Sequence, residues 1–128
     1  MSITPGLEAS VQRVVGPTDT ARALGSGDVD VLGTPAVVAL CEQAAVAAVA
    51  DALDPSQTSV GTNITIDHLA PTVVGRTVTA RAHLDEVDGR TLRFVVEVSD
   101  GSVVVARGTH ARVVVDRERF TSGANERA

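Results

Sequence analysis

Three polar side chains lie in otherwise apolar segments, and their types suit acid–base and nucleophilic chemistry. Thr34 begins and Glu42 interrupts the segment 34–53, TPAVVALCEQAAVAAVADAL, and His68 ends the segment SVGTNITIDH. In an extended strand, His68 shares one face with the alternating residues Val60, Thr62, Ile64 and Ile66. A hydroxyl, a carboxylate and an imidazole can supply a nucleophile, a general base and a proton donor. Thr34, Glu42 and His68 are therefore candidate catalytic residues.

Each of these side chains also has a structural explanation. A carboxylate inside a core helix is costly unless it is paired or protonated. If Glu42 has no catalytic role, we expect it to lie where the helix reaches solvent or a partner subunit. His68 could be a core histidine with satisfied hydrogen bonds, and Thr34 could be only a helix cap. On one helix, Thr34 and Glu42 lie about 80° and about 12 Å apart. They can line one groove, but they cannot bond each other directly.

The segment 34–53 is predicted to form one long helix. Thr34 is a good N-cap residue, Pro35 suits the first helical position, and Asp54-Pro55 marks the end. Between positions 36 and 50 only Glu42 and Gln43 are polar. We therefore expect this helix to be buried on every side.

The remaining segments predict an antiparallel sheet. Residues 7–16 are predicted to be an edge strand, and residues 17–33 a mobile loop with a short helical turn. Alternation after the helix predicts four more strands, at 59–68, 77–87, 91–99 and 102–116. Leu84 should lie opposite Leu92 across a three-residue turn, Val87-Asp88-Gly89. A second turn is expected at Asp100-Gly101.

Two parts of the C-terminal region are harder to assign. The run Val103-Val104-Val105 hides which face of the last strand is apolar, so the register of that strand and the role of His110 stay open. The polar tail 117–128 is expected to be flexible, with Phe120 as its one possible anchor. His83 faces solvent in the predicted sheet and is expected to be idle.

Size and composition narrow the class of protein. With 128 residues, the chain is predicted to be a single domain, residues 1–128. Its 16 acids against 11 arginines, with no lysine, argue against a nucleic-acid partner. A single cysteine, Cys41, favours a reducing, cytoplasmic setting. No charged N-terminal leader is evident, and the apolar helix is judged too short to span a membrane.

No cofactor is expected. No cysteine or histidine cluster has metal-ligand spacing, and Gly25-Ser26-Gly27 lacks the preceding strand and following lysine of a phosphate-binding loop. Cys41 lies about 100° around the helix from Glu42, which leaves a cysteine–histidine nucleophile as a minor alternative.

These elements predict an α+β fold in which one antiparallel sheet curls around one central helix. A single layer leaves a sheet edge and some apolar surface open. We therefore expect a homodimer that forms through the sheet edge or the helix face.

The order of elements resembles the hotdog fold, and three motifs resemble the fluoroacetyl-CoA thioesterase family. These motifs are GTPAVVALCE from Gly33, GTNITIDH from Gly61 and GTHARVVV from Gly108, within a similarity that spans residues 9–120. The resemblance implies thioester hydrolysis with Thr34, Glu42 and His68 as catalytic residues. It also implies that the Gly61 backbone amide binds the thioester carbonyl and that Arg112 lies near the CoA.

One departure from this family bears on the substrate. A fluoroacetyl-selective member would be expected to close a small pocket with aromatic side chains from the loop before the threonine, and residues 17–33 contain none. We therefore predict an acyl-CoA thioesterase that acts on short- or medium-chain acyl groups. Whether fluoroacetyl-CoA is a substrate stays open. The alternative is a non-catalytic hotdog protein that binds acyl-CoA, and a hydratase is disfavoured because no paired Asp and His motif is present.

Overall fold

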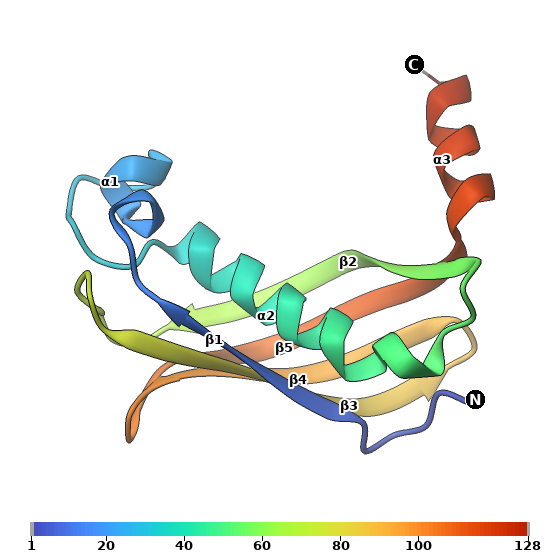
Figure 1. Cartoon of the computed structure of the whole chain (residues 1–128), viewed down its shortest axis with the longest axis horizontal. Helices are drawn as coiled ribbons and strands as arrows, with labels where there is room; N and C mark the ends of the chain where they lie inside the picture. Colours follow the sequence, from blue (N-terminus) through green and yellow to red (C-terminus); the bar gives the residue numbers. More distant parts are fainter. Residues whose placement is uncertain (1, 128) are drawn as a thin grey trace.

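The computed structural model describes residues 2–127 and has the predicted α+β architecture, a curved antiparallel sheet with one long helix across it (Figure 1). The strands are β1 (Glu8–Val14), β2 (Gln57–His68), β3 (Thr77–Asp88), β4 (Thr91–Asp100) and β5 (Val103–Asp116), in the order β1-β3-β4-β5-β2. The helices are η1 (Pro17–Asp19), α1 (Ala21–Leu24), α2 (Thr34–Val49), η2 (Ala50–Ala52) and α3 (Arg117–Glu126). The predicted edge strand at 7–16 is confirmed as β1.

Helix α2 packs mainly against β1 and β3 and much less against β2. The prediction that it is buried on every side is wrong, because Val46 is 45% exposed and Ala39 and Ala47 are exposed as well. Together with η2, the helix is 19 residues long and apolar enough to cross a membrane. The prediction that this helix is too short to span a membrane is therefore wrong, but the buried face of α2 against the sheet is that of a core helix.

The two central strands have the predicted faces. Val78, Ala80, Ala82 and Leu84 on β3 and Leu92, Phe94, Val96 and Val98 on β4 are all buried. The predicted pairing of Leu84 with Leu92 is wrong, because Leu84 lies opposite Phe94. A bulge after Leu84 lets β3 continue to Asp88, which shortens the turn to Gly89-Arg90, with Gly89 at a φ of 58°. The second predicted turn is present, but it lies at Gly101-Ser102 and not at Asp100-Gly101, because Asp100 still pairs with Val103.

Strand β2 forms the second edge of the sheet and changes face along its length. Its register with β5 shifts between Gly61 and Asn63, so the chain carries one extra residue there. Ile64 and His68 share a face, as predicted. Val60 does not share it, because the bulge exchanges the two faces and turns Ser59 inward instead.

The segment predicted as a mobile loop, residues 17–33, is anchored to β1. Arg13 donates two hydrogen bonds, of 2.9 and 2.8 Å, to the carboxylate of Asp19, and these hold the pKa of Asp19 below its usual value. The Asp19 carbonyl in turn accepts a 2.9 Å hydrogen bond from the amide of Gly33. This contact fixes the residue from which α2 begins.

The C-terminal region differs from the sequence prediction. Residues 117–126 form helix α3, capped by the Asp116 carboxylate, where a flexible tail was expected. Figure 1 shows α3 standing away from the sheet, and none of its residues is buried, so Phe120 does not anchor it in the core. The register of β5 is now defined, and it places His110 and Arg112 on the buried face.

Candidate active site

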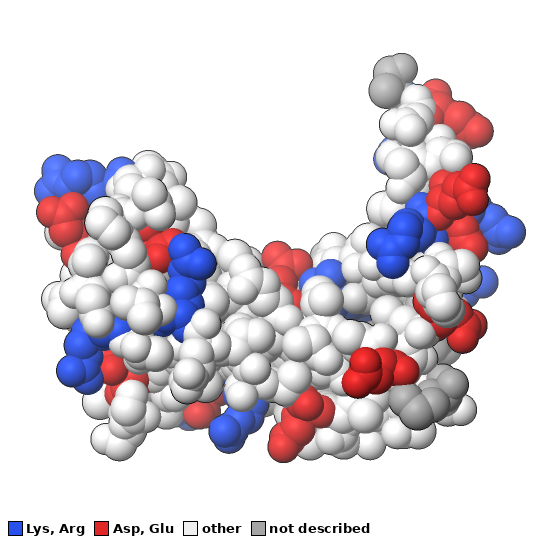
Figure 2. Space-filling view, viewed as in Figure 1, with Lys and Arg blue, Asp and Glu red and all other residues white. Residues whose placement is uncertain are grey.

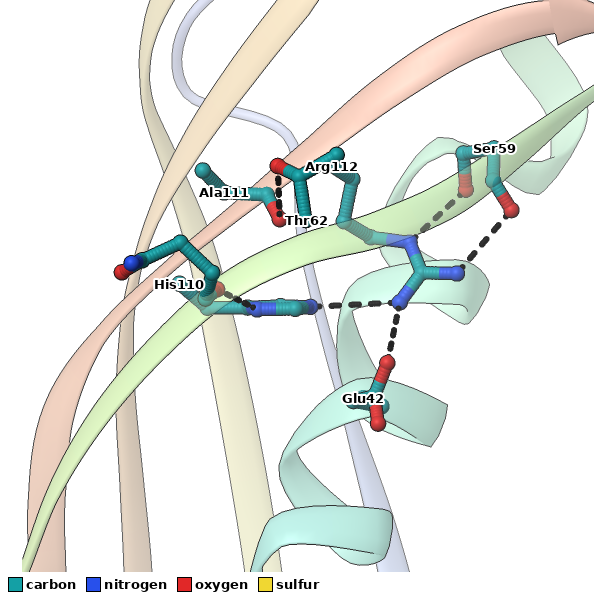
Figure 3. A network of polar contacts seen from close by, with 7 residues as sticks. Glu42, Ser59, Thr62, His110, Ala111 and Arg112 are labelled. Atoms are coloured by element: carbon teal, nitrogen blue, oxygen red, sulfur yellow. Dashed lines mark hydrogen bonds and ion pairs between the residues drawn. The ribbon is translucent and has the colours of Figure 1, made fainter.

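A buried arginine organises one half of the candidate site (Figure 3). Arg112 on β5 is 6% exposed, and its guanidinium contacts acceptors on two other elements. Its Nε donates to Ser59 Oγ at 2.9 Å, and its Nη2 donates to the Ser59 carbonyl at 3.0 Å. Its Nη1 lies 3.0 Å from Glu42 Oε2 and 3.1 Å from His110 Nε2. We call Glu42, Ser59, His110 and Arg112 the arginine cluster.

His110 is neutral in this cluster. Its Nδ1 lies 2.7 Å from the Asn63 carbonyl, which can only accept, so Nδ1 carries the proton and Nε2 accepts from Arg112. Burial lowers the pKa of His110, and the neighbouring Arg112 charge lowers it further. Its ring also stacks on Phe94. His110 therefore orients the guanidinium and does not act as a mobile base.

Glu42 is held on one side and open on the other. Its Oε2 bonds Arg112, whereas its Oε1 has no hydrogen-bond partner among residues 2–127, and its side chain is 40% exposed. A shallow pocket of about 250 Å³ opens beside it, lined also by Gly61 and Asn63. Gly61 is needed there, because a Cβ at this position would overlap Glu42 Oε2. The carboxylate is thus fixed and can still bind a water or a ligand.

Thr34 and His68 form the other half of the site. Thr34 Oγ1 lies 2.8 Å from His68 Nδ1, which joins the start of α2 to the end of β2. The prediction that Thr34 is the N-cap is wrong, because Gly33 is extended and occupies that position, so Thr34 is the first helical residue. Its hydroxyl is therefore free of a capping role. His68 Nε2 is buried and has no hydrogen-bond partner among the described residues.

The structure does not bring all the predicted residues into contact within one chain. Thr34 meets His68, and Glu42 meets Arg112, but no contact among residues 2–127 joins the two pairs. The backbone positions of Thr34 and Glu42 are about 12 Å apart along the helix. Arg112, predicted to lie near the CoA, is nearly covered and already bonded to protein acceptors. Its contact with CoA stays a prediction.

Neither Cys41 nor His83 is suited to catalysis. Burial raises the pKa of the Cys41 thiol to about 12, so the thiol stays protonated near neutral pH and is a poor nucleophile. His83 lies on the solvent side of the sheet, where its Nδ1 is 3.1 Å from a Glu8 oxygen. Among the residues described, no group of His, Cys, Asp and Glu side chains could hold a metal ion.

Ser59 and His110 also belong to the site. Ser59 was not identified from the sequence, and the role of His110 stayed open because the sequence did not define the register of the last strand. Both are two residues away from a predicted site residue on the same strand, Ser59 from Gly61 and His110 from Arg112. Residues at this spacing share a face of a strand. The spacing was readable in the sequence, but it became informative only when the bulge in β2 and the register of β5 were known.

The contact between Gly61 and Glu42 gives a stability prediction. Gly61→Ala must push the carboxylate away from Arg112, which leaves a buried guanidinium with one acceptor fewer. The free energy of unfolding in urea should fall by roughly 1.5–3 kcal/mol, the usual worth of a hydrogen bond to a charged group. Gly123→Ala is the control, because a Cβ there meets nothing within 4 Å. Equal unfolding midpoints for both variants would contradict the assigned contact.

Comparisons with known proteins agree with this architecture. Residues 15–118 match the family of fluoroacetyl-CoA-specific thioesterases. A fluoroacetyl-CoA thioesterase from Streptantibioticus cattleyicolor is 39% identical over 98 residues, which are 77% of this chain and 70% of the relative.

Solved structures are similar over almost the whole chain. A fluoroacetyl-CoA thioesterase structure superposes with a TM-score of 0.92 at 34% identity, covering 100% of this chain and 99% of the other. A hot-dog-like protein from Thermanaerovibrio acidaminovorans superposes with a TM-score of 0.88 at 26% identity, covering 98% and 93%. The predicted hotdog fold is thereby confirmed, and the chain belongs to the fluoroacetyl-CoA-specific thioesterase family.

Proposed function

We propose that the protein hydrolyses acyl-CoA thioesters to a free acid and CoA. The observation that carries this is the 2.8 Å hydrogen bond between Thr34 Oγ1 and His68 Nδ1, a hydroxyl paired with a base at the surface of the molecule. A protein that only bound acyl-CoA would have no use for this pair. A variant of a solved fluoroacetyl-CoA thioesterase was crystallised with acetyl-CoA, which supports the same class of ligand.

The chemistry can be assigned to the residues of both halves. With the proton of His68 on Nε2, Nδ1 accepts the Thr34 proton as Oγ1 attacks the thioester carbonyl carbon. The C–S bond then breaks, and His68 returns the proton to the departing thiolate of CoA. The free oxygen of Glu42 then takes a proton from a water that attacks the acyl group on Thr34; the ester C–O bond breaks, the acid leaves, and the proton passes to Thr34 Oγ1. In the alternative, the activated water attacks the thioester directly, and Thr34 relays a proton to His68 for the departing thiolate. The Gly61 amide is the proposed donor to the carbonyl oxygen.

Substitutions of Thr34 test this function. Thr34→Ala removes the hydroxyl but no cap, so its melting temperature should stay near that of the wild type. Its turnover of acetyl-CoA, followed by release of free thiol, should fall about 100-fold or more, the usual contribution of nucleophile–base pairs. Thr34→Ser keeps the hydroxyl and should keep much of the rate. Normal turnover by Thr34→Ala would leave catalysis to Glu42 and His68.

The acyl group is proposed to extend beyond two carbons. The segment before Thr34 contributes aliphatic side chains, and its Leu24 lies close to Gly33 and is 43% exposed. Residues 17–33 contain no aromatic side chain that could close that side. This favours an open rim and short- or medium-chain acyl-CoA substrates. The free cysteine, Cys41, supports the separate proposal of a cytoplasmic location.

A chain-length series tests the open rim. Acetyl-, butyryl- and hexanoyl-CoA should all be hydrolysed, and kcat/KM should change by no more than about fivefold for each added methylene, since one buried methylene contributes only about 1 kcal/mol. Leu24→Phe should lower the rate with hexanoyl-CoA more than with acetyl-CoA. Strict preference of the wild type for acetyl-CoA would mean that the rim is closed by another element, such as a partner subunit.

A homodimer is proposed because it would complete the site. Strand β2 is a 12-residue edge strand whose outer side is unpaired, and the exposed Val46 face of α2 lies on the less covered side of the sheet. If two β2 strands pair antiparallel about an axis between Ile64 and Thr65, Gly61 lies opposite the partner's His68. Each site would then combine Glu42 of one subunit with Thr34 of the other.

Mixing two inactive variants tests this shared site. Thr34→Ala and Glu42→Gln should each be nearly inactive alone. After unfolding and refolding together, they should recover about a quarter of the wild-type turnover, because half of randomly assembled dimers are mixed and each mixed dimer has one intact site. The control is the same mixture without refolding. A refolded mixture as inactive as its parents would place each site within one chain.

A further inference from the structure

A cavity of about 380 Å³ lies at the end of the sheet where α3 leaves β5. Side chains from three separate parts of the chain line it. They come from the β3–β4 turn, from the start of β2, and from the end of β5 with the first turn of α3, and they include Arg90, Gln57, Arg119 and Phe120. Figure 2 shows basic side chains at the base of α3, on the side that faces the hollow between α1 and α3. None of the residues that line this cavity belongs to the arginine cluster.

The cavity presents unpaired positive charge. Arg90 and Arg119 make no ion pair and no side-chain hydrogen bond with any residue from 2 to 127, unlike Arg13, Arg76 and Arg112. The one acid in the lining, Asp116, already accepts the Arg119 amide as the cap of α3. In a chain with 16 acids and a net charge of −5, two unpaired arginines on one cavity indicate an anionic ligand. Guanidinium groups suit phosphate oxygens in particular.

An aromatic ring lies in the same cavity. Phe120 is 49% exposed, whereas Phe94, the other of the two aromatic rings in the sequence, is buried. Since α3 buries no residue, packing inside this chain does not account for the position of Phe120. An exposed phenylalanine beside arginines is a suitable platform for a planar base. Phosphate groups and a base together describe a nucleotide.

The cavity is at a suitable distance from the catalytic residues. Gln57 precedes Gly61 by four residues on β2, and Asp116 follows Arg112 by four residues on the antiparallel β5. Four residues of a strand span about 13 Å. Acyl-CoA carries its thioester at one end of an extended pantetheine arm and its phosphates and adenine at the other. The two ends of one substrate can therefore reach Gly61 and this cavity together.

We propose that the cavity between Arg90 and α3 binds the nucleotide end of the acyl-CoA substrate. Arg90 and Arg119 hold the phosphate groups, and Phe120 stacks on the adenine ring. This inference rests on the proposed hydrolysis of acyl-CoA. It gives α3 a function in binding substrate.

Kinetics with two substrates test the proposal. The double variant Arg90→Gln/Arg119→Gln should raise KM for acetyl-CoA at least tenfold, about 1.4 kcal/mol, with kcat unchanged. The same variant should hydrolyse acetyl-pantetheine, which lacks the nucleotide, with wild-type constants. Arg81→Gln is the control, because Arg81 is exposed on β3 and has no ion pair with a described residue. Its KM for acetyl-CoA should be unchanged at the same ionic strength.

A competition experiment separates a nucleotide site from a general anion site. Adenosine 3′,5′-bisphosphate should inhibit the wild type competitively against acetyl-CoA. Its inhibition constant should be at least tenfold higher for the double variant. Inorganic phosphate at equal ionic strength should inhibit much less than the nucleotide. Equal inhibition by both would overturn the nucleotide assignment.

The outcomes distinguish this inference from the proposed function. If the wild type hydrolyses acetyl-CoA but the double variant keeps its KM, or if KM rises equally for acetyl-pantetheine, the cavity does not bind the nucleotide. If the wild type hydrolyses neither thioester, the proposed function itself is wrong. Circular dichroism and the melting temperature of the double variant verify that α3 and the sheet are intact.

Discussion

The burial of the Arg112 guanidinium is the constraint on which the arrangement of the site depends. A charge removed from water is tolerated only when nearly all of its donors are used. Ser59 on β2, Glu42 on α2 and His110 on β5 itself supply the acceptors. One side chain thus fixes the helix to the weakly covered side of the sheet. The same pairing explains why a carboxylate is tolerated in an otherwise apolar helix.

The two halves of the site differ in rigidity. In the arginine cluster, every donor and acceptor of His110 is used, and the ring of Phe94 supports it from below. At the other end, the side chains of Thr34 and His68 bond only each other among residues 2–127, where the second nitrogen of His68 has no partner. The half that contains Glu42 is therefore rigid, and the half that contains Thr34 and His68 is incomplete. This difference suits a site that another molecule completes.

Much of the architecture follows from local patterns in the sequence. Strict alternation identified every fully buried residue of β3 and β4, because one face of each strand is buried and the other is solvated. The predictions failed where an extra residue enters a strand, as after Leu84 and near Thr62, since a bulge has no signal in hydrophobicity. Helix α3 was missed for a related reason. Apart from Phe120, its large side chains are polar, so the sequence has no periodic apolar face that would predict a helix there.

The candidate site, too, was predicted where local sequence was sufficient and missed where long-range contacts decide. The types of Thr34, Glu42 and His68 were informative, because polar residues in apolar segments are costly and need a reason. Their partners depend on the register of β5 and the bulge in β2, which arise from contacts far apart in the sequence. The N-cap was wrongly predicted to be Thr34, because capping preference alone does not reveal the hydrogen bond from the Gly33 amide to the Asp19 carbonyl.

The bulge in β2 also limits how the length of this strand can change in evolution. Exposed loop tips usually tolerate insertions and deletions well, whereas a one-residue change inside a strand moves its side chains to the opposite face. Here, deletion of one residue at Thr62 would restore regular alternation and thereby turn one half of the strand over relative to the other. Either Ser59 and Gly61 would leave Arg112 and Glu42, or His68 would turn away from Thr34. Homologous chains should therefore vary in residue type along this edge while they keep its residue count between positions 59 and 68.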